Sequence, residues 1–257
     1  MGHGANILDS EFIGNWEEDG FSFLFFSRPS RAKVDELLKK HPFLTLIDEY
    51  CMTYDEWQGG AIAPFKAGHF LIVPPWNRAS GILPGEKLVL LDPGVVFGTG
   101  THPTTSDCLE ALEIVFSRED IKSVIDLGTG TGLLALAAAA LGCRKILAVD
   151  FNFLAVKTAK KNIELNGFED RLLAVHGKAE DLLFYPADLL IANIHYDVMK
   201  HLVSSEWFLQ KKMFILSGLL RSQAGHVLSQ LSQYPVKIIK KWERGGIWHT
   251  YLGEICK

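Results

Sequence analysis

Short apolar runs alternate with longer amphipathic stretches over most of the chain, from about residue 86 onward. Brief runs rich in Val, Ile and Leu predict buried strands, whereas longer stretches with apolar residues every three or four positions predict helices. A regular alternation of strand and helix indicates a mostly parallel sheet with helices on both faces. The predicted fold class is therefore α/β, with a Rossmann-like sheet.

The predicted elements follow this pattern closely. Strands are expected at 88–91, 123–126, 145–149, 172–176, 187–192 and 213–216, and helices at 106–116, 133–141, 155–166 and 222–233. The last segment, 236–255, has Gly245 and Gly246 between two apolar stretches, which predicts a β-hairpin. This hairpin would add an antiparallel pair at one edge of the sheet.

The first part of the chain has a different pattern. Residues 1–20 contain few structural signals, 21–26 predict a strand, 30–40 a helix and 44–50 a second strand, so a small βαβ-like unit is expected. Residues 55–85 are rich in Gly and Pro. We therefore predict a small α+β region at 1–53, a linker at 54–85 and the main domain at 86–257.

A glycine-rich turn joins the strand at 123–126 to the next helix. Its sequence, Asp126-Leu127-Gly128-Thr129-Gly130-Thr131-Gly132, has glycine at every second position. Gly128 and Gly130 lack a Cβ, so the backbone can adopt positive φ and lie close to a ligand. The N–H groups at the start of the helix would face that ligand. A turn that serves only helix–sheet packing is the alternative.

An acidic residue, Asp150, ends the next strand about twenty residues later, where a ribose hydroxyl pair is bound in related folds. The strict alternation of glycines differs from the G-x-G-x-x-G of dinucleotide sites. Asp126 would repel a pyrophosphate but suit an ammonium or sulfonium group, and S-adenosylmethionine carries both. Because ligands bind at the carboxyl ends of such strands, Asp126, Asp150 and Asn193 are expected around one crevice.

A second loop, 92–105, is dense in glycine and threonine and leads into a helix. Thr105 stands near the start of that helix, where a hydroxyl can cap the helix or contact a ligand carboxylate; the sequence leaves both open. His102 is expected to be a structural hydrogen-bonding residue.

Charge and cysteine content narrow the function further. A net charge of −4 argues against nucleic-acid or anionic-membrane binding as the main activity. The four cysteines, Cys51, Cys108, Cys143 and Cys256, have no metal-site spacing, so no metal is expected. The early apolar run 21–26 is too short to span a membrane. A cytoplasmic protein is predicted.

Three segments together closely resemble the PrmA family, whose members methylate bacterial large-subunit ribosomal protein eleven. These segments are Phe97-Gly98-Thr99-Gly100-Thr101-His102-Pro103-Thr104-Thr105, the glycine turn at 126–132 and Ala192-Asn193-Ile194. The similarity extends from about Tyr54 to the C-terminus. The resemblance implies a class I S-adenosylmethionine-dependent methyltransferase fold, with S-adenosylmethionine contacting Thr105, Gly128, Asp150 and Asn193, and Gly130 joining them.

The resemblance also implies an activity, and the chain differs from the family in two places. The expected activity is N-methylation of lysine or α-amino groups of a ribosomal protein. In the family a complete ferredoxin-like domain recognises that protein, whereas residues 1–53 resemble only its second half. His195 stands where leucine is usual, and Asn193-Ile194-His195-Tyr196 resembles the Asn-Pro-Pro-Tyr signature of amine methyltransferases.

Asn193 is the candidate for accepting a hydrogen bond from the amine, and His195 a candidate for taking its proton. A residue that merely lines the crevice is the alternative for His195. Two other functions remain open from the sequence: a small-molecule methyltransferase on the same fold, and a non-catalytic module that binds a nucleoside or a partner.

Overall fold

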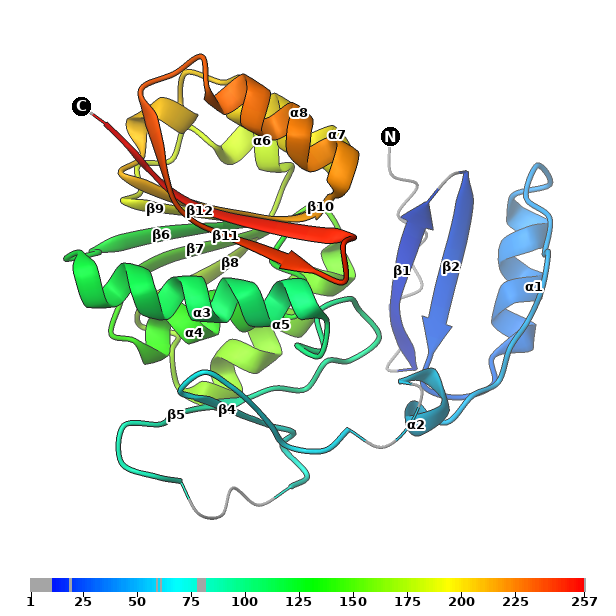
Figure 1. Ribbon diagram of the computed structural model, residues 1–257. Coiled ribbons are helices and arrows are strands. Elements are labelled where there is room, and N and C mark those ends of the chain that lie inside the picture. Colours follow the sequence, from blue (N-terminus) through cyan, green and yellow to red (C-terminus); the bar gives the residue numbers. More distant parts are fainter. Residues whose placement is uncertain (1–10, 19, 59, 61, 78–81, 257) are drawn as a thin grey trace. The chain divides into compact units, whose positions relative to one another are not determined.

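The computed structural model describes residues 11–18, 20–58, 60, 62–77 and 82–256. The chain forms two compact units, one within residues 1–62 and the other comprising residues 63–257 (Figure 1). We describe each unit by itself.

The first unit is a ββα arrangement followed by a short helix. Strand β1 (Phe12–Glu18) pairs antiparallel with β2 (Phe21–Phe26), and helices α1 (Arg31–Lys40) and α2 (Tyr54–Trp57) follow. Residues 12–18, in a segment with few structural signals in the sequence, form β1, whereas 1–10 and 19 lie outside the described residues. Ring contacts between Phe12 and Phe26 and between Trp16 and Phe23 join the two strands. Such cross-strand aromatic pairs stabilise a sheet although they give no marked alternation in the sequence.

The strand predicted at 44–50 is also wrong, because this segment has no regular secondary structure. Its large apolar side chains are exposed: Leu44 by 41%, Ile47 by 74% and Tyr50 by 74%. A strand needs backbone hydrogen bonds to a neighbouring strand, and among the described residues no strand pairs with this segment. The unit is thus ββα and not βαβ.

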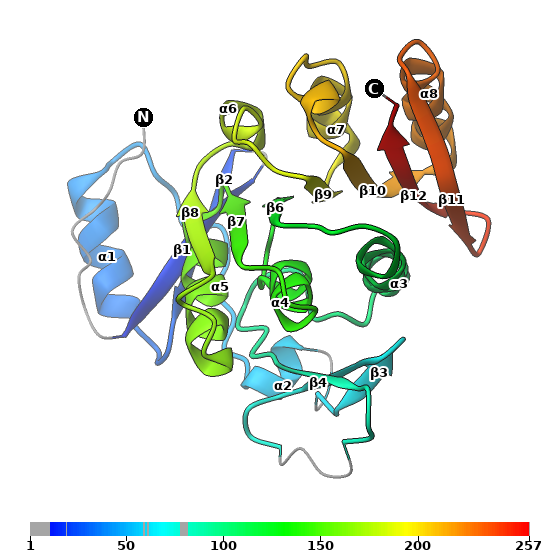
Figure 2. The ribbon, with the colours of Figure 1, turned by 90° about the vertical axis from the view of Figure 1, so that its left-hand side faces the viewer.

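The second unit is built on a seven-stranded sheet in the order β11-β12-β10-β9-β6-β7-β8 (Figure 2). The five strands β6 to β10 are all parallel to one another. Strand β12 runs antiparallel to both of its neighbours, β10 and β11. Their bounds are β6 (Ser123–Leu127), β7 (Lys145–Asp150), β8 (Leu172–His176), β9 (Leu189–Asn193), β10 (Met213–Leu220), β11 (Val236–Arg244) and β12 (Trp248–Ile255).

Helices cover both faces of this sheet, as Figure 2 shows. One face carries α3 (Pro103–Arg118), α4 (Leu133–Ala140) and α5 (Phe153–Asn166). The other carries α6 (Ala179–Leu182), α7 (Tyr196–Val203) and α8 (Arg221–Leu231), with the 3₁₀ turn η1 (Phe208–Gln210) between α7 and β10. Two separate apolar cores result, and β9 serves both: Leu189 and Ile191 face one, Leu190 and Ala192 the other. This explains why the strands are continuously apolar.

A smaller sheet precedes the large one in the second unit. It consists of β3 (Phe65–Ala67), β4 (Phe70–Val73) and β5 (Lys87–Leu90), with β4 antiparallel to β3 and parallel to β5. Every residue of β4 is buried. Asn166 of α5 accepts a hydrogen bond from the Leu90 N–H and donates one to its carbonyl. These contacts hold the small sheet against the main fold.

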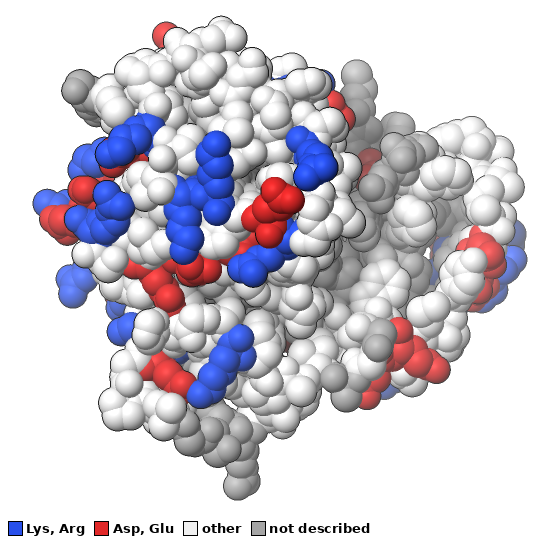
Figure 3. Space-filling model, viewed as in Figure 1, with Lys and Arg blue, Asp and Glu red and all other residues white. Residues whose placement is uncertain are grey.

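The α/β class and the antiparallel C-terminal hairpin predicted from the sequence are confirmed. On the face shown in Figure 3, basic and acidic side chains intermingle. One ion pair of the second unit joins Lys240 of β11 to Glu110 of α3. Within the described residues, we find no helix with the length and hydropathy needed to cross a membrane.

Candidate active site

The order of the strands creates a switch point next to β6. From β6 the chain proceeds outward to β7 and β8, then returns to place β9 on the other side of β6. The connections on the two sides leave in opposite directions, which opens a crevice outside the carboxyl ends of these strands. Asp150 is the last residue of β7 and Asn193 the last of β9. Both therefore lie at the carboxyl end of the sheet, where the glycine turn follows β6.

The glycine turn needs its glycines for backbone conformation and for space. Gly128 has φ +73°, and a Cβ there would lie 2.0 Å from Cγ2 of Ile194. Gly130 has φ +56°, and its Cβ would lie 2.6 Å from the Phe97 carbonyl oxygen. The Gly128 and Thr129 N–H groups both donate to the Val149 carbonyl oxygen, which fixes the turn to β7. A side chain at either glycine would displace the segments around the crevice.

Asp150 is held by backbone donors on both carboxylate oxygens. Oδ2 accepts from the Gly130 N–H at 2.9 Å and Oδ1 from the Asn152 N–H at 2.9 Å. Burial raises the pKa of this carboxyl, and the two N–H donors act in the opposite direction. A carboxylate has about four lone-pair positions, so two remain for further donors such as sugar hydroxyls. The residue as a whole is buried, with 8% exposed.

Two exposed aromatic residues follow Asp150 and were not predicted as site residues. Phe151 is 65% exposed and Phe153 58%. The His176 ring lies edge-on to Phe153, and its Nε2 donates to the Phe151 carbonyl oxygen at 2.8 Å. The sequence signal was an aromatic–x–aromatic pattern directly after the acid at the strand end. These rings offer an apolar surface beside Asp150.

Asp126 lies at the expected strand end but is almost completely buried, with 1% exposed. Its Oδ2 accepts a hydrogen bond from the Thr129 hydroxyl at 2.6 Å. Burial, assisted by the nearby charge of Asp150, raises its pKa to about 7. The carboxyl is therefore buried under the glycine turn, where it holds the Thr129 side chain. The expectation that it borders the crevice as an exposed group is wrong.

The threonine-rich loop packs directly on the glycine turn. The Thr131 hydroxyl donates to the Gly98 carbonyl oxygen at 2.7 Å. The fully buried Asn162 of α5 donates from Nδ2 both to the Thr131 carbonyl oxygen and to that of Asp92, at the start of the loop. Two segments of the sequence that were interpreted separately thus form one structure.

The start of α3 reaches the end of β9 through Thr104. Thr105 lies in the first turn of α3 and is buried, with its N–H donating to the His102 carbonyl oxygen. The neighbouring Thr104 accepts a hydrogen bond at Oγ1 from Nδ2 of Asn193, at 3.3 Å. The structure therefore joins Asn193 to Thr104, a contact that the sequence analysis missed.

His195 lies two residues beyond Asn193, at the N-cap of α7, and is exposed. Its carbonyl oxygen accepts from the N–H groups of Val198 and Met199 at the start of the helix. Because the residue is exposed, its imidazole is accessible to an approaching molecule at the same end of the sheet as Asn193.

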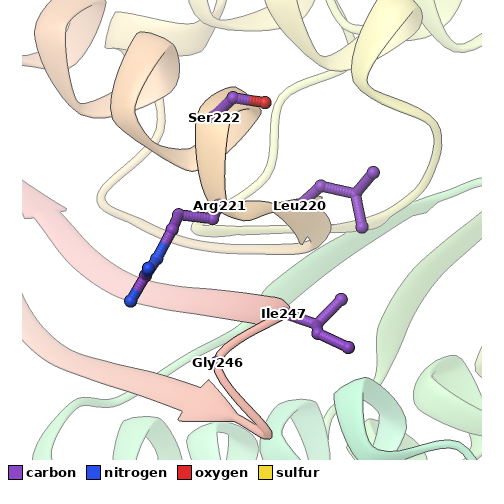
Figure 4. Close-up of a pocket in the computed structure, with 5 residues that line it drawn as sticks. All are labelled: Leu220, Arg221, Ser222, Gly246 and Ile247. Carbon is purple, nitrogen blue, oxygen red and sulfur yellow. The ribbon is translucent and has the colours of Figure 1, made fainter.

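A hollow of about 600 Å³ lies at the same end of the sheet, beyond the end of β10 (Figure 4). Leu220, Arg221 and Ser222, at the junction of β10 and α8, form one side, and Gly246 and Ile247, in the turn between β11 and β12, form the other. Since β10 is parallel to β9, this junction and Asn193 are at the same end of the sheet.

Known proteins match both the sequence and the fold. Residues 52–254 match the family model described as Ribosomal protein L11 methyltransferase (PrmA). A Desulfitobacterium hafniense protein named Ribosomal protein L11 methyltransferase is 37% identical over 95% of this chain and 87% of its own length. One of the same name from Carboxydothermus hydrogenoformans is 38% identical over 71% of this chain, but the match covers only 60% of that protein.

Solved structures agree. A ribosomal protein L11 methylase from Lactobacillus delbrueckii subsp. bulgaricus has a TM-score of 0.65 and 27% identity, over 76% of this chain and 99% of that one. The N-terminal domain of human METTL16, solved in complex with SAH, has a TM-score of 0.55 and 17% identity over 66% of this chain and 76% of its own, a likeness of fold. The sheet is therefore that of the class I S-adenosylmethionine-dependent methyltransferases, and the chain belongs to the PrmA family of ribosomal protein L11 methyltransferases.

Proposed function

We propose that this protein transfers methyl groups from S-adenosylmethionine to amino groups, of lysine side chains or an α-amine, in ribosomal protein L11. The observation that carries the proposal is the convergence of Asp150, the glycine turn and Asn193 at the switch point of the sheet. Family membership supports the methyltransferase activity and the protein substrate.

The residues at the crevice fit the cofactor. The two lone-pair positions left on Asp150 suit the ribose hydroxyls, and the exposed rings of Phe151 and Phe153 suit the adenine. We propose that the methionyl part lies against the backbone of the turn at Gly128 and Gly130, whose positive φ angles only glycine adopts readily. We propose Thr105 as a further contact, through its position in the first turn of α3.

S-adenosylmethionine, when bound, supplies an electrophilic methyl group on a sulfonium. The protein must then hold a neutral amine in line with that methyl group and exclude water. We propose that Asn193 accepts a hydrogen bond from the amine through its side-chain carbonyl. We propose His195 as the group that takes up the proton, because its exposed imidazole is near Asn193 in the sequence and at the same edge.

The protein substrate would approach over the hollow between Leu220 and Ile247. This hollow is at the end of the sheet where Asn193 lies, and Ile247 is 54% exposed there. We propose residues 1–53 as the part that recognises the substrate. The segment 54–85, expected to be a linker, includes β3 and β4 of the second compact unit, so we propose that the catalytic domain begins near residue 63 and not at 86. Because the proposed substrate is a ribosomal protein, we propose that the reaction takes place in the cytoplasm.

The test is a transfer assay with purified components. Radiolabelled S-adenosylmethionine is incubated with the protein and purified L11, and the products are separated by size and identified by mass spectrometry. We expect label in L11 at amino groups, and we expect its loss with Asn193→Ala. A parallel incubation replaces L11 with a cell extract: label in its small-molecule fraction, with none in L11, would favour the small-molecule methyltransferase. Binding of cofactor with no label in any fraction would favour a non-catalytic module.

A further inference from the structure

Asn193 is linked to a short chain of side-chain hydrogen bonds that continues away from the crevice. Its Nδ2 is 3.3 Å from Oγ1 of Thr104, and the same Oγ1 is 2.7 Å from Nδ1 of His102. The Thr104 N–H also points to that Nδ1, at 3.4 Å. The three residues come from the loop before α3, from α3 and from the end of β9.

Counting hydrogens assigns a direction to each bond. A ring nitrogen that accepts the Thr104 N–H carries no proton of its own, so Nδ1 of His102 is an acceptor. The hydroxyl of Thr104, which has only one hydrogen, must then donate it to this Nδ1. The oxygen of that hydroxyl is left to accept, so Asn193 has to present its NH₂ group to Thr104.

The environment of His102 keeps this direction in place. The Trp248 ring lies edge-on to the imidazole, with ring centroids 4.9 Å apart, and the Phe97 ring is tilted to it at 6.2 Å. Burial lowers the pKa of His102, so the imidazole stays neutral and its Nδ1 remains free to accept. Asp107 of α3 is paired with Arg244 of β11, and Glu110 of α3 with Lys240 of β11.

We propose that His102 and Thr104 are positioning residues that hold the Asn193 amide with its carbonyl oxygen toward the acceptor amine. The inference rests on the proposed function and adds the means by which the amide is oriented. An Asn side chain has two orientations that differ by exchange of its oxygen and nitrogen. Only the one that presents the oxygen can accept a hydrogen bond from an incoming N–H.

The opposite orientation would place two donors face to face. An amine that meets the NH₂ group of Asn193 loses the hydrogen bond and is turned away from the methyl group. Within the described residues no group donates a hydrogen bond to Oδ1 of Asn193, which lies beside Gly218, where a Cβ would be 2.9 Å from it. The preference is therefore set by Thr104 and, through it, by His102.

Matched substitutions separate this role from a packing role. Thr104→Val keeps the shape of the side chain but removes the hydroxyl, whereas Thr104→Ser keeps the hydroxyl. His102→Asn keeps an acceptor near the position of Nδ1 and a good helix N-cap, whereas His102→Leu removes both. The measurements are kcat and KM for L11, and the Kd for S-adenosylmethionine by calorimetry.

We expect Thr104→Val and His102→Leu to lower kcat about tenfold, the effect of one lost hydrogen bond in the transition state, with the Kd of the cofactor unchanged. Thr104→Ser and His102→Asn should retain most of kcat. A Thr104→Val variant as active as the wild type would overturn the inference. So would equal losses in the Val and Ser variants, or a loss of kcat matched by a loss of cofactor affinity.

A readout without turnover keeps the inference separate from the proposed function. The side-chain NH₂ signals of Asn193 can be assigned in a ¹⁵N–¹H NMR spectrum by comparison with Asn193→Asp. We expect Thr104→Val to shift these signals strongly and Thr104→Ser to leave them in place. Unmoved signals in Thr104→Val would reject the orientation even if L11 is methylated. A wild type that fails to methylate L11 but shows these shifts would reject only the proposed substrate.

Discussion

The tight packing of the glycine turn against the segment after β9 leads to a quantitative prediction for Gly128→Ala. Two costs are expected. An alanine at φ +73° costs about 1–2 kcal/mol in backbone strain. Its methyl group would also lie 2.0 Å from Cγ2 of Ile194, and such overpacking costs about 1–3 kcal/mol. The free energy of unfolding should therefore fall by about 2–5 kcal/mol.

The two costs can be separated by truncating Ile194. In Ile194→Ala the nearest remaining atom is Cβ, 3.4 Å from the new methyl group, which is an ordinary contact. Gly128→Ala in that background should cost only the backbone share, about 1–2 kcal/mol. Gly167→Ala is a matched control, because Gly167 has φ +65° and no atom within 4 Å of its added Cβ.

Urea unfolding of the four variants of the cycle, with calorimetric titration of S-adenosylmethionine, measures both effects. We expect a coupling energy of about 1–3 kcal/mol between positions 128 and 194. Cofactor affinity should be weakened most in Gly128→Ala alone. A coupling energy near zero, or a Gly128→Ala cost equal to that of Gly167→Ala, would refute the close approach of the turn to Ile194.

Three further outcomes follow from buried or exposed single residues. The pKa of Asp126, raised to about 7, lets the native protein keep a proton that the unfolded chain loses above about pH 4. Thermal unfolding should therefore show stability falling by up to about 4 kcal/mol as pH rises through this window, and Asp126→Asn should remove that slope. Burial lowers the pKa of Lys211 to about 8, so stability should rise as pH increases from about 8 to 10.5, and Lys211→Met should abolish the rise. Ile247→Glu should raise the KM for L11 but leave the Kd of the cofactor unchanged; equal effects on both would rule out the hollow as an approach for the substrate.

The main sheet could be predicted from the sequence because each of its parallel strands is buried on both faces. Such strands are short and continuously apolar, and the amphipathic helices between them contrast clearly. The first unit lacks that contrast. Its β1 is recognised only through pairing with β2, and the apolar residues of 44–50 remain exposed with no strand beside them.

The site was predictable in part for similar reasons. Gly128, Asp150 and Asn193 stand at the ends of strands, and the topology of a parallel sheet places such ends together. The contact between Thr104 and Asn193 joins residues 89 positions apart, and no local pattern encodes it. The burial of Asp126 depends on how the Thr131–Gly98 contact folds the loop over the turn, which the sequence does not display.

The cofactor site is tested most directly by calorimetric titration of S-adenosylmethionine into the wild type, Asp150→Ala and Asp170→Ala. Asp170 is an exposed acidic residue just before β8, at the N-terminal end of the strands and so opposite to the crevice, and it serves as the control. We predict that Asp150→Ala weakens binding by roughly 10- to 100-fold, as expected for lost hydrogen bonds to a charged group, and that Asp170→Ala binds as the wild type does. Wild-type affinity in Asp150→Ala would contradict the placement of the cofactor at the ends of β6, β7 and β9.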